Sequence, residues 1–153
     1  ESITYDFATG TRSVVNDFKM FFPDLPGKPL KVGDSWPSSF AIAEKVGPAD
    51  MRLDFQLVNS LEGFETVDGL ECARIKANVT GTISGTGSQQ GLEMIFGGTH
   101  QGTDVWYFAV KEGFFVKSTS ELTTDATISI SGPQNMTLPS KSTRKSEVIL
   151  ASR

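Results

Sequence analysis

The sequence ARIKANVTGTISG, at positions 73–85, alternates small or apolar residues with polar ones along its whole length. Every second residue from Ala73 to Ile83 is small or apolar, whereas Arg74, Lys76 and the positions that alternate with them are polar. A period of two is the side-chain period of a β-strand, because successive side chains point to opposite faces. The pattern therefore predicts a long strand with one face in a core and the other in solvent, as in antiparallel sheets.

The same alternation recurs at positions 51–57 and 126–130, and turn residues connect the segments. Asp68-Gly69 suits a type I′ hairpin turn, since both positions of that turn need positive φ. Lys111-Glu112-Gly113 predicts a second hairpin, with Gly113 in the left-handed conformation.

Glycine-rich segments predict the remaining turns. We expect them at 85–91, at 97–102 and at Gly132-Pro133. Together with the two hairpins, these turns predict an all-β, mainly antiparallel meander of about eight strands. We expect the meander to form an open or flattened barrel.

One segment departs from the period of two and has the spacing of an amphipathic helix. Thr11 or Ser13 can cap it, and Pro23 ends it, because the residue before proline is disfavoured in the α region. We therefore expect a short helix at 12–22, packed on the concave face of the sheet. The apolar residues that recur at this spacing, in the helix and just beyond it, are Val14, Val15, Phe18, Phe21, Phe22 and Leu25.

The composition is that of one soluble domain. A chain of 153 residues supports one core, so we treat 1–153 as a single β domain. The net charge of −4 and the scattered Lys and Arg argue against nucleic acid as a partner, and no apolar run reaches transmembrane length. Because the chain begins at Glu1 rather than Met, we expect a trimmed or mature fragment of a longer precursor.

No catalytic or metal-binding constellation is recognisable, so we expect no catalytic residue, no metal and no cofactor. His100 is the single histidine, and its glycine-rich flanks predict a solvent-facing turn, with a catalytic role as the alternative. Cys72, the single cysteine, is interpreted as a structural thiol on the face opposite Ala73. A solvated charged edge, rather than a cation site, is the interpretation of Glu62, Glu65, Asp68 and Glu71.

The run VWYFAV at 105–110 is apolar on both sides of one strand, which requires cover on both faces. It is interpreted as a central strand beneath the helix. The alternative is an apolar ligand pocket, and both remain open because a core and a cavity use the same residue types. The candidate ligand-binding residues are Phe18, Phe21, Phe22, Trp106 and Phe108.

Four motifs carry a resemblance. PDLPGKPLKVGDSW at 23–36 and DGLECARI at 68–75, followed by GTDVWYF at 102–108 and GFFV at 113–116, resemble uncharacterised bacterial envelope proteins and lipoproteins. More distantly, strands wrapped around a hydrophobic helix are similar to the open barrel of the outer-membrane lipoprotein carrier family. This resemblance implies lipid handling in the bacterial periplasm or cell envelope, although none of that family's binding residues maps onto this chain.

We therefore expect a non-enzymatic, exported envelope protein that binds an apolar ligand or lipid, or another envelope protein. The alternative is a structural or protein-interaction module with a fully packed core. Charged residues near the last strand would guard its edge against pairing, namely Lys141, Arg144, Lys145 and Glu147. A hydrolase is the minor alternative and requires His100 to pair with a serine in a cleft.

Overall fold

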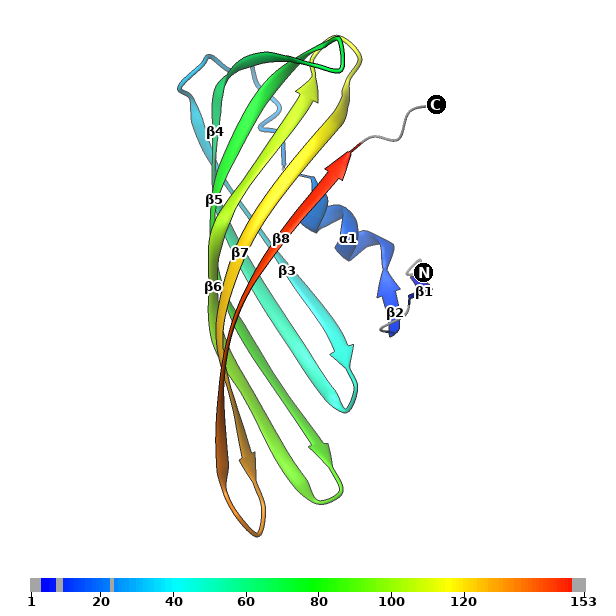
Figure 1. Cartoon of the computed structure of the whole chain (residues 1–153), viewed down its shortest axis with the longest axis vertical. Helices are drawn as coiled ribbons and strands as arrows, with labels where there is room; N and C mark the ends of the chain where they lie inside the picture. Colours follow the sequence, from blue (N-terminus) through cyan, green and yellow to red (C-terminus); the bar gives the residue numbers. More distant parts are fainter. Residues whose placement is uncertain (1–3, 8–9, 23, 150–153) are drawn as a thin grey trace.

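The computed structural model describes residues 4–7, 10–22 and 24–149, and for residues 4–7, 10–12, 17, 20 and 21 it describes the backbone alone. These residues form eight strands and one α-helix (Figure 1). Strands β1 and β2 pair with each other and lie apart from the main sheet. The elements are β1 (Thr4–Phe7), β2 (Gly10–Ser13), α1 (Val14–Phe21), β3 (Ser35–Val46), β4 (Ala49–Val67), β5 (Leu70–Gln89), β6 (Leu92–Ala109), β7 (Phe114–Ser131) and β8 (Met136–Ile149).

The main sheet is an antiparallel meander of six strands in the order β3-β4-β5-β6-β7-β8. Its two edges, β3 and β8, do not pair with each other, so the sheet is open. The strands bow, and the concave side faces α1 (Figure 1). The prediction of an all-β antiparallel meander is confirmed, but the sheet contains six strands rather than about eight.

One predicted turn, 97–102, lies wholly inside a strand, and another, 85–91, is confirmed but is narrower than predicted. Positions 97–102 lie in the middle of β6, and most of 85–91 belongs to β5, which turns into β6 at Gln90-Gly91. Gly98 and Gly102 serve close approach between strands, whereas Gly91 lies in the turn with a φ angle of 78°. A Cβ on Gly98 or Gly102 would overlap the backbone of β7, so these glycines permit strongly curved strands.

The other three predicted turns are confirmed. Asp68 and Gly69 have φ angles of 49° and 81° and connect β4 to β5. Gly113 has a φ angle of 78°, and its N–H donates to the Ala109 carbonyl oxygen at 2.8 Å. Gly132 and the residues that follow it separate β7 from β8.

The main core lies on the concave, inner face of the sheet. Directly paired residues of neighbouring strands share a face, so the core forms rows across the sheet. Leu57 pairs with Val79 in one row, and Leu61 with Ile75 in another. The strand at 73–85 thus buries the face that its alternation predicts. The buried cluster contains Trp36, Ile42, Phe55, Leu57, Leu61, Ala73, Ile75, Ala77, Val79 and Trp106.

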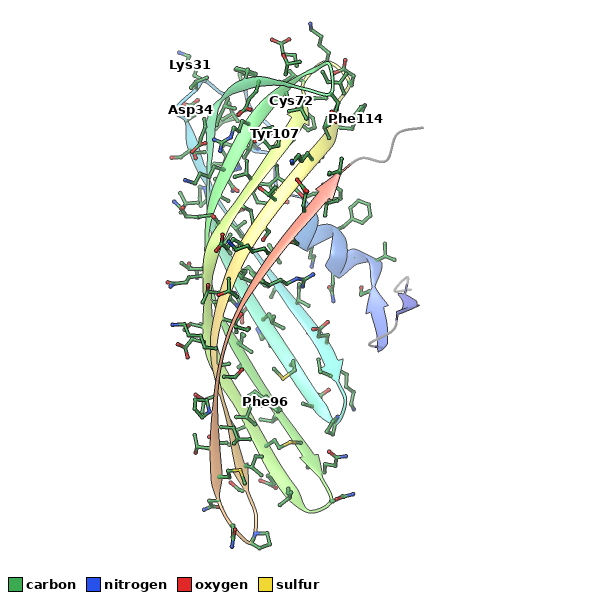
Figure 2. All side chains as sticks on the ribbon, viewed as in Figure 1. Lys31, Asp34, Cys72, Phe96, Tyr107 and Phe114 are labelled. Carbon is green, nitrogen blue, oxygen red and sulfur yellow. The ribbon has the colours of Figure 1, made fainter. Side chains whose placement is uncertain are left out.

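A smaller cluster on the outer face contains Cys72, Ala109 and Val116, with Tyr107 packed against it. Cys72 and Tyr107 lie near the upper end of the sheet (Figure 2). Burial raises the pKa of the Cys72 thiol, which agrees with a structural role. β6 thus buries Trp106 on its inner face and Ala109 on its outer face, whereas Val110, at the end of the run 105–110, is 48% exposed.

Charged side chains pair across the strands. Arg74 lies between the carboxylates of Glu62 and Glu65, so the acidic edge carries its own cation. No group of three or more His, Cys, Asp or Glu side chains in the described residues is arranged to hold a metal ion. Exposed pairs of this kind contribute about 0–1 kcal/mol each. Further pairs are Lys111–Glu71, Lys117–Glu147, Lys141–Asp125 and Lys145–Glu121.

Helix α1 is shorter than the predicted 12–22 and makes few contacts with the sheet. Ser13 caps it, and its Oγ accepts a hydrogen bond from the Asn16 N–H at 3.5 Å. The ring of Phe22, just beyond the helix, packs on Phe115 of β7 with 5.1 Å between centroids. Phe18 contacts Phe22 but is 61% exposed. The expected phenylalanine-rich packing face is therefore not confirmed, and the Phe21 side chain lies outside the described residues.

The linker at 24–34 covers part of the inner face in place of the helix. Trp36 donates its indole N–H to the Asp24 carbonyl oxygen at 2.8 Å, and Leu30 packs against the buried cluster. The turn into β3 is closed by hydrogen bonds from the Lys31 N–H to the Asp34 carboxylate and from the Asp34 N–H to the Lys31 carbonyl (Figure 2). Because the linker is anchored here, α1 meets the sheet at its C-terminal end.

Candidate functional site

A pocket of about 270 Å³ lies between the C-terminal end of α1, the start of the linker and the inner face of the sheet. Lys19, Phe22 and Asp24 form its outer wall. Its floor is mostly aromatic and aliphatic with a few polar groups, which is the usual composition of a small-molecule site. The floor residues come from β3 to β7 and are Ser38, Ser39, Phe40, Phe55, Leu57, Val79, Asp104, Trp106, Ser120 and Leu122.

An aromatic stack forms one end of this floor. Phe40 stacks on Phe55 with 4.7 Å between centroids, and Phe55 stacks on His100 at 4.3 Å. Phe55 pairs in β5 with Gly81, which has no side chain, so His100 can extend from β6 across β5. A Cβ on Gly81 would overlap the His100 ring and the Asp54 carbonyl oxygen. The stack therefore requires glycine at this position.

His100 lies within β6 and is 2% exposed, so the prediction of a solvent-facing turn is wrong. Its flanking glycines curve the strand instead of ending it. Its Nε2 donates to the Asp54 carbonyl oxygen at 3.0 Å, and Nε2 carries the proton because a carbonyl can only accept. Burial lowers the pKa of the imidazole, which favours the neutral form. The hydrolase alternative requires a serine partner, whereas this contact is made with the backbone.

Asp104 is the charged residue of the pocket floor. It projects from β6 and pairs across the sheet with Ala77 on one side and Ser120 on the other. A hydrogen bond from Ser120 favours the carboxylate, but burial has the larger effect and raises the pKa of Asp104. Its Oδ1 is buried and has no hydrogen-bond partner among the described residues. A buried acceptor without a donor costs about 1–3 kcal/mol, so a donor at this point would be favourable.

A second buried acceptor lies in the same row, on the far side of Ala77. The Asn59 side-chain amide donates to the Trp36 carbonyl oxygen at 3.3 Å and to Ser38 Oγ at 2.8 Å. Its Oδ1 has no partner in the part of the chain that the structure describes. Ala77, which is fully buried, separates Asn59 from Asp104 in this row. This row thus contains two buried side-chain oxygens without a donor among the described residues.

The residues predicted to bind a ligand occupy different places. Phe22 and Trp106 both line the pocket. Phe18 lies mainly in solvent, and Phe108 packs against the buried core instead of lining the pocket. For Phe21 no side chain is described. The structure therefore brings two of the predicted residues together at one site.

The sequence analysis did not identify the polar residues of the pocket, although the position of Asp104 in the alternation of β6 indicated one of them. Asp104 stands two positions before Trp106, so the alternation of β6 places this acid on the same inner face. A charged residue at a core-facing position is informative because it must be paired or functional. Phe40 and Leu122 had no comparable signal, since their places depend on strand register.

No helix in the described ranges is long and apolar enough to cross a membrane. The chain matches no protein-family model, and no curated protein or solved structure shows significant similarity to it. The functional conclusion therefore depends on the geometry and chemistry of the pocket.

Proposed function

We propose that the protein is a non-enzymatic binding protein of the bacterial envelope that holds an apolar or amphipathic ligand, such as a lipid chain, on its concave face. The observation that carries this proposal is the pocket of about 270 Å³ with its apolar floor. This volume lies just below the range of about 300–1,000 Å³ for drug-sized ligands, which suits one alkyl chain better than a bulky molecule. Burial of each methylene would contribute about 0.8 kcal/mol.

The shape of the concave face supports an elongated ligand. A smaller hollow of about 50 Å³ shares Asp104, Trp106, Ser120 and Leu122 with the pocket and continues to β8. The two hollows together follow the sheet from β3 to β8. Placement in the envelope is supported by the resemblance of the motifs at 23–36 and 68–75 to envelope proteins and lipoproteins.

Binding of a neutral fluorescent dodecyl probe tests the proposal. Leu122→Trp would place a large side chain in the pocket and should weaken probe binding at least about tenfold, since it occupies the volume of the chain. Thr123→Trp is the matched control, because Thr123 faces the other side of β7 and contacts Thr143 there. Both variants are compared by circular dichroism to establish that they fold.

Two results would overturn this function. One is the absence of probe binding to the unmodified protein, together with native mass spectra in which the purified protein carries no ligand. The other is equal loss of binding in the Leu122 and Thr123 variants, which would place the probe elsewhere on the sheet.

A protein-interaction module is the second candidate, favoured by apolar side chains at the end of the inner face remote from the pocket. Met136 and Leu138 are exposed there, and Phe96 lies toward the same end (Figure 2). The neighbouring edge of β8 has no paired strand and is open to an added one. A photo-crosslinker at position 138, compared with one at 141 on the opposite face, tests this candidate in cells. Crosslinks from 138 alone would favour it, and equal crosslinking would contradict it.

A further inference from the structure

Asp104, at the polar end of the pocket, has an unpaired buried acceptor, and this restricts the ligands that fit. The buried Oδ1 atoms of Asp104 and Asn59 lie in one row, and neither has a donor within the described residues. The hydroxyl of Ser120 already reaches the Asp104 carboxyl, which still retains its unpaired oxygen. Asp104 lines the pocket and Asn59 does not, so a purely apolar ligand would leave the Asp104 carboxyl without a further donor.

The charge of the residues that line the pocket also favours a ligand with hydrogen-bond donors. Lys19 is opposed by Asp24 and Asp104, which gives the lining a formal charge of −1. Lys19 and Asp24 are exposed at the rim, whereas Asp104 lies on the floor. The ion pairs found in the described part of the chain do not include Asp104, although Arg144 borders the adjoining hollow. Within the part of the chain that the structure describes, the acid of the floor therefore forms no ion pair.

We propose that the pocket binds a long-chain primary amine, with its alkyl chain on the apolar floor and its ammonium group donating hydrogen bonds to Asp104. This inference rests on the proposed function and names the ligand class of the same site. An ammonium group carries three N–H donors, enough for the Asp104 carboxyl and for neighbouring oxygens. Hydrogen bonds between ionised partners are roughly twice as strong as neutral ones.

A fatty acid fits the same floor less well. Its carboxylate would bring a second negative charge beside Asp104 in a site largely shielded from water, where like charges repel strongly. Lys19 at the rim and Arg144 at the adjoining hollow could attract it, but both side chains are exposed, so solvent and salt screen the interaction. The ammonium ligand, in contrast, offsets the effect of burial on the Asp104 carboxylate.

A series of ligands with one chain length separates the head group from the chain. Dodecylamine, dodecyltrimethylammonium, dodecanol and dodecanoate compete with the neutral dodecyl probe at neutral pH, each below its micelle concentration. We expect dodecylamine to bind at least about tenfold tighter than the other three. Dodecyltrimethylammonium is the decisive comparison, because it keeps the positive charge but has no N–H donor.

Asp104→Asn removes the charge and keeps the shape of the side chain. It should fold, because burial disfavours the carboxylate that it replaces. We expect the variant to bind dodecylamine about tenfold more weakly and dodecanol with little change. Asp125→Asn is the matched control, since that exposed acid lies on the outer face of β7 opposite Lys141.

Each outcome has one meaning. Preference for dodecylamine that Asp104→Asn abolishes and Asp125→Asn retains supports the inference. Equal binding of all four ligands, tightest binding of dodecanoate, or a preference that survives in Asp104→Asn overturns it and leaves the proposed function intact. If none of the ligands, including the neutral probe, binds to the folded protein, the proposed function fails and the inference fails with it.

Discussion

Gly81 shows how a residue without a side chain determines what its neighbours can do. It stands between Phe55 and His100 on the inner face, and its missing Cβ lets the imidazole lie across β5. The histidine then satisfies the Asp54 carbonyl oxygen and extends the aromatic stack beside the pocket. The value of this glycine is space rather than backbone freedom, because its φ angle is not in the left-handed region.

Replacing this glycine should be costly. We expect Gly81→Ala to lower the free energy of unfolding by about 1–3 kcal/mol, because the new methyl group displaces the His100 ring. Gly97→Ala is the control, since a Cβ at Gly97 meets no atom within 4 Å. That change should be neutral or stabilising by about 0.4–1 kcal/mol through the unfolded chain. Urea unfolding measures both values, and equal effects would contradict the role given to Gly81.

At the scale of elements, α1 depends on its attachments. A helix of eight residues is not stable alone in water, because so few hydrogen bonds cannot offset the cost of nucleation. Ser13 caps its start, and Phe22 connects its end to Phe115 of β7. The linker that follows is anchored by the hydrogen bond from Trp36 to the Asp24 carbonyl. The position of α1 as the wall of the pocket therefore depends on these few contacts.

Removal of one contact should loosen the helix without unfolding the sheet. We expect Phe22→Ala to speed amide hydrogen exchange in α1 about two- to tenfold, because an aromatic pair contributes about 0.5–1.5 kcal/mol. Phe18→Ala should have a smaller effect, since its ring is mainly in solvent and does not reach the sheet. Exchange measured by mass spectrometry decides between them. A larger effect from Phe18 would show that α1 is held differently.

At the scale of the whole molecule, the core occupies only part of a long sheet. The buried cluster and the linker lie toward the upper end, whereas the lower ends of β5 to β8 extend beyond α1 (Figure 1). There the inner face keeps its apolar alternation, but side chains such as Leu138 are 42% exposed. Local stability against unfolding should therefore differ strongly between the two ends of the same strands.

Two leucine truncations measure this difference. Leu61→Ala, at a site that is 4% exposed within the core, should lower the free energy of unfolding by about 2–5 kcal/mol. Leu138→Ala should cost less, about 1 kcal/mol, because 42% of the surface of Leu138 is already exposed. Denaturant unfolding gives both values. A similar loss at the two sites would mean that the lower end is covered in solution.

Local sequence determined the strands, the 68–69, 111–113 and 132–133 turns and the cap at Ser13, because period-two alternation, positive-φ turn residues and capping hydroxyls act within a few residues. The structural role of Cys72 was also visible from its place in the alternation. Only the tertiary structure decided that 85–88 and 97–102 are strand, because a glycine that ends a strand and one that makes room for a neighbour look alike until the neighbour is known. Three further features depended on the tertiary structure: the burial of His100, the exposure of Phe18, and the position of Asp104 in one pocket with Phe22 and Trp106. They follow from strand register and from the position of the linker, which are set by contacts between distant segments.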